Sequence, residues 1–492
     1  MRVALLTVAF PPEGSNGGMA SFYYELSQSL VASGHQVLVA TLTSGPDEDL
    51  HIGGMQISRR HFDSMEYHNL QDLNLAPAMA HSLPQAVEIY RTLNTVVTSF
   101  SPDVIECAEN CALGLIWAAQ RKFPLAVRCV CPQFHLMEVG CSGDYSSLDL
   151  QLVKAAETFV LERADTLTTP SRSLARIISD GTGLPLEKFK IIANPLVAFE
   201  SSESDASTSI FPANAFPKLL FVGRIEELKG ADLLVEILPI VKSTYPNVHL
   251  TFIGSEPTAP GLNISFADRL RERLTQLDLS GHVTFTGTLP RTSIPAVQSE
   301  ADLCLIPSRY DSSPYACLEA MLNGCCVIAS DVGGIPEYVD HGENGWLVKS
   351  NDPSALAEAV VYLAAHTDVR ERLGEAAKLH VSSKCAPQTI ATQTVALYED
   401  AINHFKCNPP DRQTKSTQFF INAFEQYCSG PYFTSFTNSL YEEGRSAGFA
   451  DGYARGIVDE RNKHLRTTKS FARSLLKLPN AVVAPILRLF AN

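Results

Sequence analysis

A pair of glycines and one carboxylate suggest where this sequence could bind a ligand. Gly333 and Gly334 stand in the stretch Val332–Glu337, which opens an expected helix, and free backbone N–H groups at such a place suit a phosphate. Glu319 lies in the helical pattern Tyr315–Leu322, and its carboxylate can accept hydrogen bonds from sugar hydroxyls. A tight turn and a solvated helix residue would explain the same residues, and periodicity alone does not separate the two interpretations.

The elements around these residues predict an open parallel sheet. The apolar run Leu303–Ile306 is an expected strand, and a polar turn, Ser308–Pro314, leads from it into the helix that Gly324 ends. A second apolar run, Cys326–Ala329, gives the next strand. Strands that alternate with helices bring their loops to one edge of a sheet, and that edge is where such sheets bind ligands.

The stretch Asp302–Tyr338 resembles the nucleotide-sugar signature of the retaining glycosyltransferases of family 4, which have the GT-B fold. The matching segments are Leu318-Glu319-Ala320-Met321, Gly324, Val327-Ile328-Ala329 and Gly333-Gly334-Ile335-Pro336-Glu337. The family usually places a Glu before seven intervening residues and the second Glu, and Asp311 stands there instead. Its carboxylate would sit about 1.5 Å further back, and a misplacement of about 1 Å can lower a rate about a hundredfold. Either the loop compensates or the donor differs from the common ones.

Two cations follow the expected strand Lys218–Val222, in Gly223-Arg224 and Lys229-Gly230. In family 4 this Gly-Arg and Lys-Gly pair supplies two positive charges to the donor diphosphate. Such charges in a dry cleft stabilise the negative charge that gathers on a leaving nucleoside diphosphate. Ordinary solvated charges at the end of a strand are the alternative.

The first half of the chain carries a second part of the resemblance. The loop after the expected strand Arg2–Val8 is not GxGxxG, so we expect no nicotinamide cofactor. Its pair Gly17-Gly18 resembles family glycines that lie against the donor phosphate and help to form the acceptor pocket. His135, after the expected strand Leu125–Val130, resembles a family histidine that reaches the donor sugar. A plain turn and a packed histidine are the alternatives.

Glu106 and Glu109 flank the end of another expected strand, Val104–Cys107. They could touch an acceptor, but an exposed polar loop is the interpretation that we prefer.

The resemblance implies a same-face, metal-independent sugar transfer from a UDP- or GDP-sugar to a hydroxyl of a glycan, lipid or other acceptor. The departing phosphate can take the acceptor's proton, so no protein nucleophile is required. We expect no metal and no cofactor beyond the nucleotide-sugar co-substrate, because the cations neutralise the phosphates and no carboxylate cluster has ligand spacing. The expected catalytic residues are His135, Arg224, Lys229 and Asp311. The expected donor-binding residues are Gly17, Gly18, Gly223, Arg224, Lys229, Ser312, Ser313, Leu318, Glu319, Gly333, Gly334 and Ile335.

The chain has 492 residues, which predicts two domains with additions. Repeated strand–helix units, with the resemblance, predict an α/β GT-B fold of two doubly wound, Rossmann-like parallel-sheet domains. We expect an acceptor-binding domain over 1–200, a linker over 201–217 and a nucleotide-sugar domain over 218–386. A crossover helix over 387–406 would pack on the N-terminal domain, and 407–492 would form a helical extension.

Composition restricts the possible binding partners of the protein and its location in the cell. The formal net charge of −14 argues against nucleic acid, and no window is long and apolar enough to cross a bilayer. Twelve cysteines without a CxxC pair indicate reduced thiols and a cytoplasmic protein. Residues 461–492 carry basic and apolar side chains without an acidic one, so this tail could bind an anionic membrane surface, a protein partner or the enzyme's own acidic surface.

Two other functions fit parts of these observations. A non-catalytic GT-B partner would bind nucleotide and use the tail to recruit a membrane or a second transferase. A nucleotide-sugar epimerase would need acid–base carboxylates at the cleft, and the sequence shows no clear set of them. The donor sugar, its base and the acceptor are not assigned by fold similarity.

Overall fold

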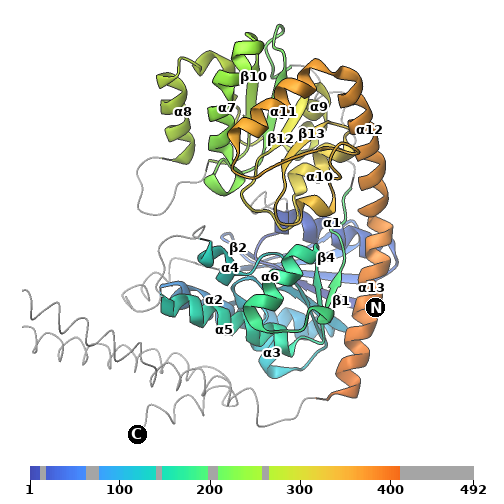
Figure 1. The fold of residues 1–492 in the computed structure, drawn as a ribbon. Coiled ribbons are helices and arrows are strands. Elements are labelled where there is room, and N and C mark those ends of the chain that lie inside the picture. The colour runs from blue at the N-terminus through green and yellow to red at the C-terminus, as the bar shows by residue number, and fades with distance from the viewer. Residues whose placement is uncertain (12–17, 63–76, 140–146, 198–208, 257–264, 410–492) are drawn as a thin grey trace, which may run out of the picture.

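The computed structural model describes residues 1–11, 18–62, 77–139, 147–197, 209–256 and 265–409. Figure 1 shows two domains, one above the other, with a pair of C-terminal helices running along one side of both. The described residues do not include Gly17, residues 198–200, residues 201–208 of the expected linker, the extension from 410 onwards or its basic tail 461–492.

The N-terminal domain is built on an eight-stranded sheet in the order β3-β4-β2-β1-β5-β6-β7-β8. Its strands are β1 Arg2–Leu6, β2 Gln36–Thr43, β3 Glu48–Ile52, β4 Met55–His61, β5 Val104–Ala108, β6 Leu125–Arg128, β7 Thr166–Thr169 and β8 Phe189–Ile191. Its helices are α1 Gly18–Ala32, α2 Pro77–Phe100, α3 Leu115–Gln120, α4 Gln133–Glu138, α5 Ser147–Arg163 and α6 Arg172–Thr182. The pairs are parallel except for the hairpin of β3 and β4, which the sequence did not predict.

The C-terminal domain has a six-stranded parallel sheet in the order β11-β10-β9-β12-β13-β14. Its strands are β9 Lys218–Val222, β10 His249–Ile253, β11 Val283–Phe285, β12 Leu303–Ile306, β13 Val327–Ser330 and β14 Trp346–Val348. Its helices are α7 Ala231–Thr244, α8 Phe266–Gln276, α9 Ile294–Glu300, α10 Tyr315–Leu322, α11 Pro353–Ala365 and α12 Thr367–Lys384. The predicted architecture of two doubly wound parallel sheets is confirmed.

One predicted element is much shorter than expected. The glycine pair opens only a single 3₁₀ turn, Ile335–Glu337, because the chain turns back soon afterwards through Gly342 and Gly345 into β14. The carboxylate of Glu337 also accepts from the backbone N–H groups of Arg172 and Ser173, at 2.9 and 2.8 Å, and so caps α6 of the other domain.

The last described helix, α13 (Pro387–Cys407), leaves the C-terminal domain and packs against the N-terminal one. Its Tyr398 is fully buried and donates a hydrogen bond of 2.9 Å to Glu106. Glu106 also pairs with Arg128 at 3.3 Å, and neither charged side chain is exposed. The exposed loop expected around Glu106 is therefore wrong: the residue belongs to β5, and a buried cation compensates its charge.

Glu109 is buried as well, and with Glu157 of α5 it holds the loop that leads into α4. The carboxylate of Glu109 accepts from the Val130 N–H at 2.8 Å. Glu157 accepts from the N–H groups of Gln133 and Phe134 at 2.9 and 3.1 Å, at the start of α4. The expectation of an exposed Glu109 is wrong, because backbone donors replace its water. These bonds fix the helix that carries His135.

Glycine allows the C-terminal loops to approach each other closely. Gly230 has a φ of +69°, and a Cβ placed there would lie 2.0 Å from the Pro307 carbonyl oxygen. Gly342 has a similar φ of +77°, but a Cβ there would meet nothing within 4 Å. The two positions therefore separate the cost of backbone strain from the cost of lost space.

We expect Gly342→Ala to lower the free energy of unfolding by about 1 kcal/mol, from the left-handed backbone alone. Gly230→Ala should cost about 3 kcal/mol, because the loops after β9 and β12 must also move apart. Urea unfolding followed by circular dichroism measures both variants. Equal losses would show that the contact with Pro307 does not constrain the loops.

A pH dependence follows from the buried carboxyls. Burial raises the pKa of Glu157 to about 8 and that of Glu109 to about 7, from 4.5, although backbone N–H donors oppose the shift. The folded chain therefore binds these protons more tightly than the unfolded chain does. Their contribution to stability is complete below about pH 4.5 and is lost as the pH rises through the folded values.

We expect the Tm to fall as the pH is raised from about 5.5 to about 8.5. Glu157→Gln should make this fall smaller, because its amide does not titrate. Glu371→Gln, at an exposed position of α12, should keep the wild-type slope. Thermal unfolding across this pH range tests the claim, which a wild-type slope in Glu157→Gln would contradict.

Candidate functional site between the two sheets

The expected site centres on the carboxyl ends of β9 and β12, where Lys229 and Asp311 meet. The Lys229 Nζ lies 2.7 Å from an Asp311 carboxylate oxygen. Their side chains are 25% and 13% exposed, so the pair is largely withdrawn from water and its attraction is screened less than at a surface. Both residues were predicted from the sequence as site residues, and the structure brings them together.

The glycine pair lies directly against the Asp311 loop. A Cβ on Gly333 would come within 2.1 Å of the Asp311 carbonyl oxygen, and one on Gly334 within 2.2 Å of the Ser312 carbonyl oxygen. The Gly334 N–H donates to the Asp311 carbonyl at 2.8 Å, and the Ile335 N–H donates to Val332 at 3.1 Å. The expectation of free N–H groups at both glycines is thus wrong for Gly334. Of the N–H groups of Gly333, Gly334 and Ile335, that of Gly333 has no hydrogen-bond partner within the described ranges.

The serines after Asp311 contact the other domain. Ser312 Oγ donates to the Val130 carbonyl at 2.6 Å, and Ser313 Oγ accepts from the Asn194 amide at 2.9 Å. Leu318 is fully buried in the core beside the sheet, so its side chain does not face the site.

Arg224 pairs with a different carboxylate from Lys229. Its side chain is 56% exposed and pairs with Glu226 at 2.9 Å. The loop that carries it is anchored, because the Ile225 N–H donates to the Ser255 carbonyl at 2.9 Å. Gly223, just before Arg224, has a φ of +151°. More than half of the Arg224 side chain is open to solvent, while the Glu226 oxygen that it contacts is buried.

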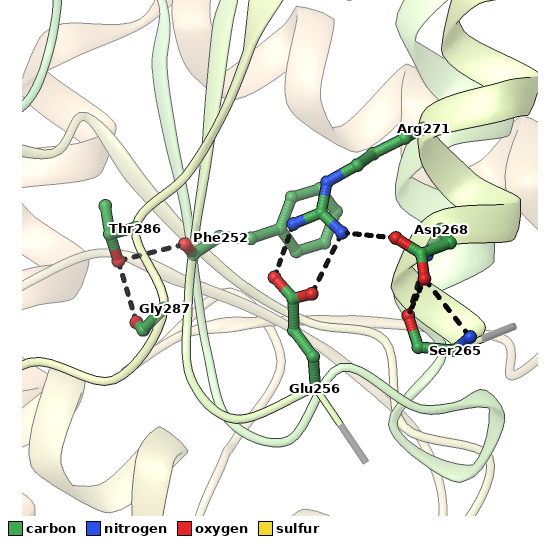
Figure 2. Close-up of polar contacts among 7 residues, drawn as sticks. All are labelled: Phe252, Glu256, Ser265, Asp268, Arg271, Thr286 and Gly287. Carbon is green, nitrogen blue, oxygen red and sulfur yellow. Dashed lines mark hydrogen bonds and ion pairs between the residues drawn. The ribbon is translucent and has the colours of Figure 1, made fainter. Parts of the chain in front are cut away.

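A polar network that sequence reasoning missed fixes the neighbouring loops after β10 and β11 (Figure 2). Arg271 of α8 donates to both carboxylate oxygens of Glu256, at 2.5 and 2.9 Å, and to Asp268 at 3.0 Å. Asp268 forms a capping box with Ser265. Beside them the Thr286 hydroxyl donates to the carbonyls of Phe252 and Gly287. This network borders the loop of Arg224.

Glu319 is held by a cation that the sequence did not single out. Arg291 lies 2.7 Å from Glu319 and 2.6 Å from Glu25 of α1, so one guanidinium joins carboxylates of the two domains. Burial raises the pKa of Glu25 to about 7, although Arg291 opposes this shift. Arg291 stands after β11 in no recognisable motif, and only the three-dimensional arrangement shows its contacts.

The two described N-terminal residues of the expected site face the C-terminal domain. Gly18 begins α1, and a Cβ there would lie 3.5 Å from the ring of Tyr315. His135 in α4 packs edge-on against Tyr310, with ring centroids 4.9 Å apart. Burial lowers the pKa of His135, which favours its neutral ring. The structure therefore places His135 beside the loop of Asp311.

Two features are absent from the part of the chain that the structure describes. No group of three or more His, Cys, Asp or Glu side chains there could hold a metal ion. Among the helices of that part of the chain, none is long and apolar enough to cross a membrane.

Known proteins resemble this chain over both domains. Residues 17–195 match the glycosyl transferase 4-like domain, and residues 207–380 match the glycosyl transferases group 1 model. Glycogen synthase of Mycobacterium tuberculosis is 28% identical over 408 residues, which cover 81% of this chain and 94% of that protein.

Solved structures agree on the fold. Sucrose-phosphate synthase of Thermosynechococcus elongatus has a TM-score of 0.66 at 20% identity, covering 82% of this chain and 99% of that one. Anabaena HepE, solved with UDP and glucose, has a TM-score of 0.62 at 20% identity, covering 81% and 99%. The sheets, the crossover helix and the two matched domains lead to one conclusion. The chain is a glycosyltransferase of the family 4 type with the GT-B fold.

Proposed function

We propose that this enzyme transfers a sugar from a nucleoside diphosphate sugar to a hydroxyl acceptor, with retention of the anomeric configuration. The observation that carries the proposal is the Lys229–Asp311 pair, which lies at the carboxyl edge of the C-terminal sheet and directly against the Gly333 loop. This edge is where open parallel sheets bind nucleotides. UDP and UDP-glucose occur in structures of HepE, which supports a UDP-sugar as donor, with a GDP-sugar as the other choice.

In the proposed mechanism, Lys229 and Arg224 stabilise the charge that develops on the departing diphosphate. A phosphate oxygen takes the acceptor's proton on the same face, while the sugar passes through an oxocarbenium-like state. Asp311, held by Lys229, accepts a hydrogen bond from a sugar hydroxyl, and Glu319, held by Arg291, accepts from the ribose. Since two side-chain cations serve the diphosphate, we propose a reaction without a metal ion or other cofactor.

The path of the acceptor, the location of the enzyme and the partner of its C-terminal tail are also proposals. The acceptor, a glycan, lipid or other hydroxyl compound, would enter past Gly18 and His135 in the N-terminal domain. We place the enzyme in the cytoplasm, where residues 461–492 would bind an anionic membrane surface or a protein partner.

We expect Lys229→Ala to lower kcat about 100- to 1,000-fold, because a preorganised charge at the leaving group is lost. Lys406→Ala, at an exposed position of α13, should leave kcat unchanged. The assay follows nucleoside diphosphate release from UDP- and GDP-sugars, with a panel of acceptors and with EDTA present. Proton NMR of the product should show the donor's anomeric configuration. Unchanged turnover in Lys229→Ala, an inverted product or a requirement for added metal would each contradict the proposal.

A further inference from the structure

Tyr310 carries a polar atom for which the folded chain provides no partner. Its phenol hydroxyl is buried and makes no hydrogen bond within the described residues. Buried tyrosine hydroxyls usually find a partner, since a polar group withdrawn from water without one destabilises the folded state. Burial raises the pKa of Tyr310, so the hydroxyl keeps its proton and can donate as well as accept.

A second polar atom in the same situation lies in the opposite domain. His135 Nε2 is also buried and has no hydrogen-bond partner in the described part of the chain. The His135 and Tyr310 rings meet edge-on at 4.9 Å and 68°. Two elements of different domains thus bring together two rings that each carry a buried polar atom without a hydrogen-bond partner in the described residues.

The backbone on both sides of Tyr310 is anchored. Arg309 donates to both carboxylate oxygens of Asp232, at 2.6 and 2.8 Å, and its own N–H donates to the Leu228 carbonyl at 2.8 Å. Asp311 on the other side pairs with Lys229. Because both neighbours are fixed, the tyrosine is held beside the proposed diphosphate site, and such rigid support is what a specific binding residue needs.

We propose that the hydroxyl of Tyr310 binds a hydroxyl of the transferred sugar and thereby selects the donor. The inference rests on the proposed function, because the sugar in question is that of the nucleotide donor. A phenol and a neutral imidazole each donate and accept hydrogen bonds, as sugar hydroxyls do. A donor whose sugar lacks the contacted hydroxyl would leave Tyr310 unpartnered and would bind more weakly.

The test compares the affinity for the nucleotide sugar with the affinity for its nucleoside diphosphate. Calorimetric titration measures the Kd of the nucleotide sugar and the Kd of its nucleoside diphosphate for wild type and for Tyr310→Phe. We expect Tyr310→Phe to bind the nucleotide sugar about 5- to 10-fold more weakly, with the diphosphate affinity changed less than about twofold. Tyr362→Phe is the matched control and should change neither affinity. Tyr362 of α11 is 41% exposed, and its ring packs on Trp346 of the edge strand β14.

Two further readouts separate binding from folding. Deoxy-sugar donors should include one analogue that wild type and Tyr310→Phe bind equally, because it lacks the hydroxyl in question. Tm without ligand should stay the same or rise by about 2–4 °C in Tyr310→Phe, since an unpartnered buried hydroxyl is removed. The inference alone is overturned if Tyr310→Phe leaves nucleotide-sugar binding intact, or weakens the sugar and the diphosphate equally. Failure of wild type to bind any nucleoside diphosphate would overturn the proposed function as well.

Discussion

The ion pair between Lys229 and Asp311 is the contact on which the site depends. It joins the loop after β9 to the loop after β12, the two central strands of the C-terminal sheet. The backbones can come this close because Gly230 lies against Pro307 and Gly333 against Asp311, where a side chain would not fit. The shorter side chain of Asp311 reaches Lys229 without an added methylene. The loops thereby hold a positive charge and a carboxylate in fixed positions at one edge.

Ser312 and Glu319, which were expected to bind the donor, also take part in contacts between the two domains. Ser312 bonds to the Val130 carbonyl, and Arg291 links Glu319 to Glu25 across the domains. Hydrogen bonds to charged groups contribute about 1.5–3 kcal/mol each, and a nucleotide sugar offers hydroxyls and phosphates of matching chemistry. Exchange of these contacts for bonds to a donor would therefore couple ligand binding to the arrangement of the domains.

The sequence predicted best where local pattern and tertiary environment agree. The strands Lys218–Val222 and Leu303–Ile306 and the helix Tyr315–Leu322 have their predicted bounds, since apolar runs there are ended by Pro or Gly. The hairpin of β3 and β4 was missed because β3, with the sequence EDLHI, has few apolar residues and lies at the sheet edge. Glu106 and Glu109 were misjudged since charged residues are normally exposed, and only distant partners such as Arg128 and Val130 make their burial possible. Arg291 belongs to no motif, and Tyr310 lies outside the matching segments of the stretch Asp302–Tyr338. Their contacts across the domains are not revealed by one sequence.

A crystal structure of the protein with a bound nucleoside diphosphate, UDP or GDP, tests the central claim most directly. The account predicts density for the diphosphate at the carboxyl edge of the C-terminal sheet, with a phosphate oxygen within hydrogen-bonding distance of Lys229 Nζ and the Arg224 guanidinium nearby. A nucleotide bound elsewhere, or a diphosphate directed away from both cations, would contradict it.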